Sequence, residues 1–192
     1  MIFIQRMPIM KKNIVFACLI WTALTAVLFA WNYKNALQEQ RSLALQSARS
    51  FFQQIVLFRS WNAGHGGVYV PVTDKTLPNP YLEDPLRNIT VNKNLSLTRI
   101  NPAFMTRQVS EIAMEKEGVK FHITSLRPIR PENRPSDMEE AALKEFEKGL
   151  AETGKIITDS HSEGFFYMSP LITEKSCLTC HAKQGYRHGE IR

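Results

Sequence analysis

The sequence predicts an α+β fold, in which helices cover one side of a small antiparallel sheet. Segments with helical and strand-like patterns alternate irregularly along the chain, and two strand-like segments near the C-terminus are close enough in sequence to form a hairpin. Hydrophobic residues make up 44% of the 192 residues and charged residues 22%, which is typical of a globular protein rather than a disordered one. The length allows one domain of ordinary size with an additional anchor or tail.

The first element is an uncharged, apolar segment at 14–31, which predicts a transmembrane helix. At a rise of about 1.5 Å per residue, it is long enough, or nearly so, to cross a hydrocarbon core of about 30 Å. Lys11 and Lys12 precede it, so residues 1–13 are expected in the cytoplasm and the rest in the bacterial periplasm, with one pass through the inner membrane. A cleaved signal peptide is the alternative, although no clear small-x-small cleavage site follows.

Residues 32–62 predict one long amphipathic helix that leaves the membrane. No proline interrupts it, and apolar side chains recur at steps of three and four residues, at Leu37, Ala44, Ala48, Phe51, Phe52, Ile55 and Phe58. Because this seam is roughly heptad-like, two interpretations are open. The helix packs on its own domain, or it pairs with a second copy in a homodimer.

The remainder, 63–192, is expected to form the globular domain. The segment 64–67, Gly-His-Gly-Gly, ends the long helix, and a short strand follows at 68–70. From 71 to 92 the chain is rich in Pro, Asn, Asp and Leu with little periodicity, and we expect an extended irregular loop around 77–86.

A helix is predicted after this loop. Asn101 and Pro102 place a proline in its first turn, and Gly118 ends it. The alternating pattern of 120–126 then predicts a strand.

A second helix is predicted by its capping residues. Residues 127–135 contain three prolines and form a loop, and Ser136 with Glu139 three residues later has the spacing of a capping box. This helix continues through Leu150, and Gly154 closes it.

The C-terminal part predicts a hairpin and a helical turn. Strands at 155–159 and 165–172 are joined by a turn at 162–164, Ser-Glu-Gly. The motif at 177–181 follows and is expected to start a helical turn.

That motif, Cys-Leu-Thr-Cys-His, has the form of a c-type haem attachment sequence. Its spacing lets both thiols reach the two vinyl groups of one haem, and the adjacent imidazole is placed to bind the iron. We therefore predict one haem c, covalently attached through Cys177 and Cys180, with His181 as an axial ligand. The third cysteine, Cys18, lies in the apolar segment and is expected to be a packing residue.

A zinc site and a redox disulfide are the alternatives for the same motif. A structural zinc ion needs four ligands, and the sequence has no second pair at a suitable spacing. A thioredoxin-like cysteine pair would open a helix within a βαβ unit, which the sequence does not predict.

The second axial ligand is left open. His65 is the tentative sixth ligand, because its glycine neighbours let the backbone approach a flat cofactor closely. A lone histidine is more often a polar surface residue, and an open or water-bound iron is a further alternative. The other candidate side chains are His122, His161, His188, Met105, Met114 and Met168.

The charge pattern excludes some functions. The formal net charge is +6, but the positive residues are scattered singly, so nucleic-acid binding is not expected. No GxGxxG, Walker loop or Ser-His-Asp spacing is present, and we expect no enzyme activity. Arg107, Arg127 and Arg130 are expected either to pair with haem propionates or to form a solvated face.

Four blocks of the sequence, in the same order, resemble one family. They lie at 61–70, 101–108, 122–128 and 177–181. From about 32 to 192 the chain is similar to the PAS-like, c-type haem-binding domains often called Tll-type. Such domains occur as extracytoplasmic sensors of bacterial histidine kinases, diguanylate cyclases and chemoreceptors, and as free-standing proteins. The resemblance implies a PAS-like antiparallel sheet with flanking helices, haem on Cys177 and Cys180, and His181 as axial ligand.

The sequence departs from this family in two respects. A protein of the family that this chain resembles uses a further cysteine as the other axial ligand. Here the only other cysteine is Cys18, which lies in the apolar segment. Family members usually continue past a segment like 185–192 into another strand, and often into a second membrane helix and an output domain. Whether this chain is a fragment or a stand-alone protein is left open.

Together these patterns predict a membrane-anchored periplasmic haem sensor that responds to redox state or to a small gas such as O2, NO or CO. A small membrane-anchored c-type cytochrome for electron transfer is the second hypothesis. A structural interaction domain without haem is the third.

Overall fold

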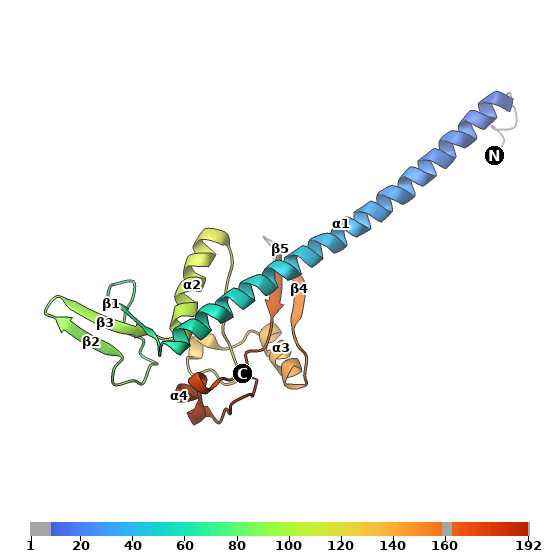
Figure 1. Ribbon diagram of the computed structural model, residues 1–192. Coiled ribbons are helices and arrows are strands. Elements are labelled where there is room, and N and C mark those ends of the chain that lie inside the picture. The colour runs from blue at the N-terminus through green and yellow to red at the C-terminus, as the bar shows by residue number, and fades with distance from the viewer. Residues whose placement is uncertain (1–8, 159–162, 192) are drawn as a thin grey trace. The chain divides into compact units, whose positions relative to one another are not determined.

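The computed structural model describes residues 9–158 and 163–191, and its first element is one long helix. Helix α1 (Ile9–Gly64) is continuous over 56 residues, so the two predicted helices at 14–31 and 32–62 are a single helix. The chain divides into two compact units, Met1–Gln46 and Ser47–Arg192. Figure 1 shows the elements in chain order.

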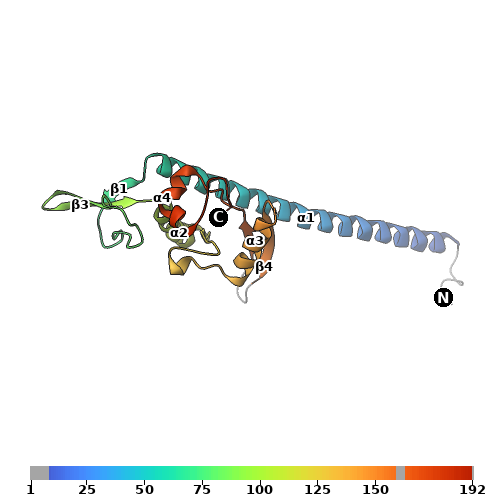
Figure 2. The ribbon, with the colours of Figure 1, turned by 90° about the horizontal axis from the view of Figure 1, so that it is seen from below.

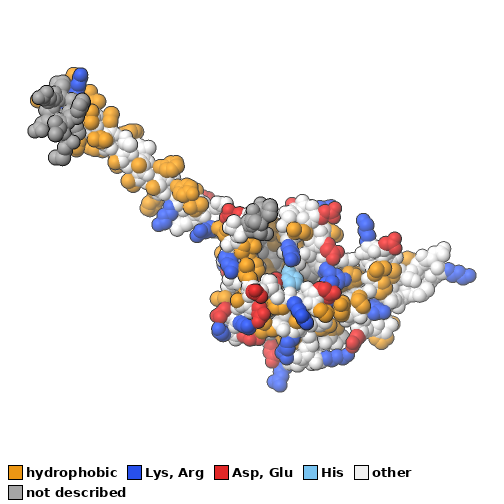
Figure 3. Space-filling model, turned by 180° about the vertical axis from the view of Figure 1, so that it is seen from behind, with side chains coloured by type: hydrophobic (Ala, Val, Ile, Leu, Met, Phe, Trp, Pro, Cys, Tyr) orange, Lys and Arg blue, Asp and Glu red, His pale blue; other side chains and the backbone are white. Residues whose placement is uncertain are grey.

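In the first unit, the stretch of α1 at 14–31 carries no charged residue, and large apolar side chains are exposed along it. Trp21 and Phe29, for example, are 74% and 72% exposed, and hydrophobic side chains cover this part of the helix in Figure 3. By length and composition the helix can cross a membrane, although a signal sequence near an N-terminus has the same features. In water so many exposed apolar side chains are unfavourable.

The second unit contains a three-stranded antiparallel sheet with the order β1-β3-β2. Strand β1 (Val68–Pro71) confirms the predicted short strand, and it pairs with β3 (Leu95–Ile100). Strand β2 (Asn88–Asn92) follows the loop expected around 77–86 and was not predicted. All five residues of β2 are exposed, and an edge strand without a buried face has no alternating pattern to reveal it. The Asn92 side chain accepts a hydrogen bond from the backbone N–H of Asn94 and forms the turn between the two strands.

Helix α2 (Pro102–Glu117) has the predicted ends. The Asn101 side chain accepts a hydrogen bond of 2.9 Å from the backbone N–H of Phe104, and Gly118 ends the helix with a left-handed φ of 67°. Figures 1 and 2 both show α2 between the two sheets of this unit.

The predicted strand at 120–126 is wrong, because these residues have no regular secondary structure. Their polar groups are satisfied in another way. The backbone N–H of Phe121 donates to the Ser110 hydroxyl, and the Thr124 hydroxyl donates to the Asn133 carbonyl. Apolar and polar residues alternate here as they do in a strand, but 120–126 pair with no strand among the described residues. The sequence pattern alone does not distinguish a paired strand from such an unpaired segment.

Helix α3 (Asp137–Glu147) begins with the predicted capping box between Ser136 and Glu139. It ends earlier than predicted, because Gly149 adopts a left-handed φ of 101° and the N–H of Leu150 donates back to the Glu145 carbonyl. Its buried residues form the hydrophobic core with three partly buried neighbours, and the set is Ala142, Leu143, Phe146, Leu126, Met168 and Ile191.

Strands β4 (Thr153–Thr158) and β5 (Glu163–Met168) form the predicted hairpin as a separate two-stranded sheet. The start of the predicted turn lies outside the described residues, while Glu163 and Gly164 belong to β5. Strand β5 ends before Pro170, which cannot donate to a ladder. The fold is therefore mixed helix and sheet as predicted, but with two small antiparallel sheets in place of one.

Candidate haem-attachment site

The Cys-Leu-Thr-Cys-His motif lies on a short helical segment near the C-terminus. It spans the end of a 3-10 turn, η3 (Lys175–Cys177), and helix α4 (Leu178–His181), and a further turn, η4 (Ala182–Gln184), follows. The helical turn predicted for the motif is thus confirmed. Cys180 and His181 lie three and four residues after Cys177, so each is a neighbour of Cys177 on the helical turn. The turn therefore keeps both cysteines and the histidine within one short stretch of helix.

Both cysteines are half-buried thiols and are not joined in a disulfide. This state fits covalent attachment, because only a thiol can add to a vinyl group. Within residues 9–158 and 163–191, no three His, Cys, Asp or Glu side chains are grouped so as to hold a metal ion by themselves. A zinc-type ligand set is not formed there, whereas haem iron needs fewer protein ligands because the porphyrin supplies four nitrogens.

His181 is half-buried and held by its neighbours in the chain. Its Nδ1 lies 2.5 Å from Oε1 of Gln184, and Nε2 of Gln184 donates a 2.7 Å hydrogen bond to the backbone carbonyl of Arg127. The Tyr186 ring meets the His181 ring edge to face, with 6.1 Å between ring centroids. The guanidinium of Arg127 lies over the Tyr186 ring, 5.2 Å from its centroid.

The segment that carries the motif is closed at its base. The N–H of Thr173 donates to the Glu190 carbonyl at 2.8 Å, and the N–H of Gly189 donates to the Thr173 carbonyl at 2.9 Å. Ile172 and Ile191 form an isolated bridge, and Ile191 packs on the core of α3. The two ends of the segment that carries the motif are therefore joined to each other, and Ile191 at one end packs on the core.

The predicted sixth ligand, His65, lies at the C-terminal end of α1 and is exposed. Its Nδ1 contacts the Trp61 carbonyl at 2.8 Å, and its ring lies 4.6 Å from the Trp61 ring. These contacts explain the position of His65 by local helix-end packing, without reference to the motif.

The other candidate ligands are distributed over the unit. Nδ1 of His122 forms a 2.7 Å hydrogen bond with Oε1 of Glu139, so this ring already has a partner away from the motif. Met168 packs on the core and Met105 is half-buried, while the remaining described candidates, Met114 and His188, are exposed. His161 lies outside the described residues.

A family model, that of the Tll0287-like family, matches residues 35–191, which covers most of α1 and the whole motif. The chain belongs to the Tll0287-like family. No curated protein and no solved structure matches the chain.

The three arginines that were considered as partners of haem propionates also lie within the residues that match the Tll0287-like family. Arg127 is tied to the motif through Gln184 and Tyr186. Arg107 lies with its guanidinium 4.4 Å from the Phe104 centroid. Burial lowers the pKa of Arg107, and the positive charge of Arg130 lowers it further. Arg130 itself pairs with Glu132 at 3.2 Å.

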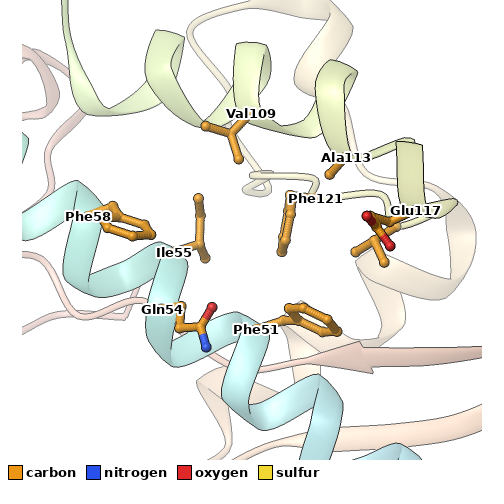
Figure 4. A pocket seen from close by; sticks show the side chains of 9 residues that line it. Phe51, Gln54, Ile55, Phe58, Val109, Ala113, Glu117 and Phe121 are labelled. Atoms are coloured by element: carbon orange, nitrogen blue, oxygen red, sulfur yellow. The ribbon is translucent and has the colours of Figure 1, made fainter. Parts of the chain in front are cut away.

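The Tll0287-like unit also has an apolar recess of about 190 Å³ between α1 and α2 (Figure 4). Its lining comes from both helices and the segment after α2, and consists of Phe51, Gln54, Ile55, Phe58, Val109, Ala113, Glu117, Val119 and Phe121. Sites for cofactors and drug-sized ligands usually occupy about 300–1,000 Å³. The recess is therefore too small for a haem and suits at most a small apolar molecule or side chain.

Two features of the Tll0287-like unit escaped the sequence patterns. Asn62 is fully buried, and its Nδ2 donates to the Ile100 carbonyl at 3.1 Å, which fixes the end of α1 on β3. Gln184 links the motif to Arg127, 57 residues away in the chain. Neither contact has a local sequence signature, because the partner in each case is a distant backbone carbonyl.

Proposed function

We propose that this chain binds one haem c, through thioether bonds to Cys177 and Cys180 and with His181 as an axial ligand. The observation that carries the proposal is that the whole motif lies on one helical turn, with Cys180 and His181 three and four residues after Cys177. In each attachment the S–H adds across a vinyl C=C, so sulfur bonds to carbon and the proton is retained on the neighbouring carbon. No further oxidant or reductant is consumed in that addition. When bound, the haem supplies an iron that changes redox state and binds small gases.

We further propose that the haem-binding unit is a PAS-like, membrane-anchored sensor domain in the periplasm, acting in signal transduction. This rests on contacts that fix α1 to the folded unit. Arg49 pairs with Glu152 next to β4, and the Tyr167 hydroxyl of β5 donates to the same carboxylate at 2.8 Å. Hydrogen bonds from Arg49 and Tyr167 lower the pKa of Glu152 to about 2. A change around the haem would then reach a helix whose other end is apolar enough to cross a membrane.

Electron transfer is the second candidate. It is favoured by the position of the motif at the surface, since Thr179 between the two cysteines is exposed. A haem edge near solvent exchanges electrons with partners without a conformational change.

The experiment is an absorption spectrum of the purified full chain, expressed with the cytochrome c maturation system. It is recorded oxidised and reduced, with and without carbon monoxide or nitric oxide. A haem spectrum that changes on gas binding is the result expected of a sensor. A six-coordinate haem that cycles reversibly and binds neither gas would contradict gas sensing and support electron transfer. The same spectrum in the His181→Ala protein would overturn the assigned ligand.

A further inference from the structure

The hydrogen bonds around Gln184 determine which nitrogen of His181 carries the proton. The amide end of Gln184 that lies 2.7 Å from the Arg127 carbonyl must be its NH2 group, because a carbonyl oxygen only accepts. The opposite end, 2.5 Å from Nδ1 of His181, is then the amide oxygen, which also only accepts. Nδ1 must therefore donate, and in the neutral imidazole the lone pair is on Nε2.

We propose that Gln184 is the positioning residue that fixes His181 as an Nε2 ligand and ties it to the backbone at Arg127. The inference rests on the proposed function, because a ligating nitrogen is meaningful only if iron binds there. Histidines that bind metals usually donate their other N–H to a fixed acceptor, which sets the tautomer and makes the ligand more basic. Here the acceptor is a side chain whose own orientation is fixed by a distant carbonyl.

The local backbone explains how Gln184 reaches both partners. It lies three residues after His181, one helical turn away, at the end of η4. Gly185 then adopts a left-handed φ of 85°, which turns the chain so that Tyr186 returns to the His181 ring. The imidazole is thus held by Gln184 through a hydrogen bond and by Tyr186 through ring packing.

The link also connects the proposed iron ligand to another part of the fold. Arg127 follows the irregular segment 120–126, and Leu126 packs against the core of α3. A shift of the His181 ring is therefore transmitted through Gln184 to the chain at Arg127, with the guanidinium of Arg127 over Tyr186 as a second contact.

The first test does not need haem. The full chain in detergent, expressed without the maturation system, is labelled with ¹⁵N-histidine, and the tautomer of each of the five histidines is read by long-range ¹H–¹⁵N NMR where the rings are neutral. We expect His181 to be protonated at Nδ1. In Gln184→Leu it should move toward protonation at Nε2, the form that an unconstrained neutral imidazole prefers. Gln184→Glu retains an acceptor for Nδ1 and should keep the wild-type tautomer. Gln108→Leu is the matched control, because Gln108 is another half-buried glutamine, bonded to Thr76 at 3.0 Å outside the motif.

The second test uses the haem-loaded protein. Outer-shell partners of metal ligands typically contribute at least about tenfold to affinity. If the affinity of the ligand set for ferric iron falls tenfold more than its affinity for ferrous iron, the reduction potential rises by about 59 mV. We expect this rise in Gln184→Leu with haem content unchanged, and no shift in Gln108→Leu.

The outcomes separate the inference from the proposed function. An Nδ1-unprotonated His181 in the wild type, or an unchanged tautomer in Gln184→Leu, would overturn the role of Gln184. If the tautomer results are as expected but no haem attaches, the hydrogen-bond assignment is supported and the proposed function is wrong.

Discussion

Replacing Glu139 by Gln should destabilise the folded unit strongly at neutral pH and weakly in acid. Glu139 is the third residue of α3 and its side chain is only 14% exposed. Its carboxylate contacts Nδ1 of His122 at 2.7 Å and accepts hydrogen bonds from the backbone N–H and the hydroxyl of Ser136. It therefore joins the irregular segment 120–126 to the start of α3.

The size of the effect follows from the pKa of Glu139. Burial raises this pKa, but the hydrogen bonds from His122 and Ser136 outweigh burial and lower the pKa from 4.5 to about 2. A shift of that size corresponds to about 3 kcal/mol of the free energy of unfolding, at about 1.36 kcal/mol per pKa unit. Because the folded-state pKa is lowered, this stabilisation is present above about pH 4.5 and is lost as the pH falls toward 2. The glutamine amide oxygen still accepts from Ser136, so we expect a loss of about 1–3 kcal/mol.

The assay is denaturant unfolding of the full chain in detergent at several pH values between 7 and about 2.5. The difference between wild type and Glu139→Gln should be largest above about pH 4.5 and shrink steadily below it. Glu140→Gln is the matched control, because Glu140 is the next residue of α3 but its side chain is 45% exposed and pairs with Lys144 at the surface. A difference that stays constant across this pH range, or an equal effect of Glu140→Gln, would refute the reasoning.

Three further predictions test other parts of the account. Phe146→Ala should lower the free energy of unfolding by about 3–5 kcal/mol, because Phe146 is completely buried; a loss below 1 kcal/mol in thermal or denaturant unfolding would mean that the core of α3 is misassigned. Asn101→Ala should cost about 1 kcal/mol by removing the cap of α2, while Asn101→Ser should largely retain stability; equal stability of the alanine and wild-type proteins would contradict the cap. An alkaline phosphatase fused after residue 192 should be active in intact bacteria if the unit faces the periplasm, and activity of a cytoplasm-dependent reporter at the same position would contradict that orientation.

The predictable parts of the fold are those that short-range chemistry specifies. The starts of α2 and α3 were predicted because Asn101 and Ser136 lie directly before their helices, and both residues cap them. The start of α1 and its continuity into the second unit have no such marker, since uninterrupted helical sequence connects the two predicted helices. Strand β2 was missed because it is exposed along its length. Residues 120–126 were predicted as a strand because apolar and polar residues alternate there, although the described structure gives them no partner strand.

The candidate site shows the same division. Cys177, Cys180 and His181 are close in sequence, so their place on one helical turn follows from their spacing alone. The role of Gln184 depends on the carbonyl of Arg127, which only the fold brings within 2.7 Å. The one histidine favoured by its glycine neighbours, His65, is explained by packing on Trp61 at the end of α1. A second axial ligand depends on contacts of the same long-range kind, and sequence spacing does not supply them.

The most direct measurement of the central claim is the intact mass of the full chain after expression with the cytochrome c maturation system. The account predicts that the wild-type chain gains the mass of one haem that survives denaturation, and that the peptide containing 177–181 carries it. Cys18→Ala should gain the same mass, whereas the double variant Cys177→Ala/Cys180→Ala should gain none. A wild-type chain that matures alongside a functional control cytochrome but keeps its unmodified mass would contradict the claim, as would haem retained by the double variant.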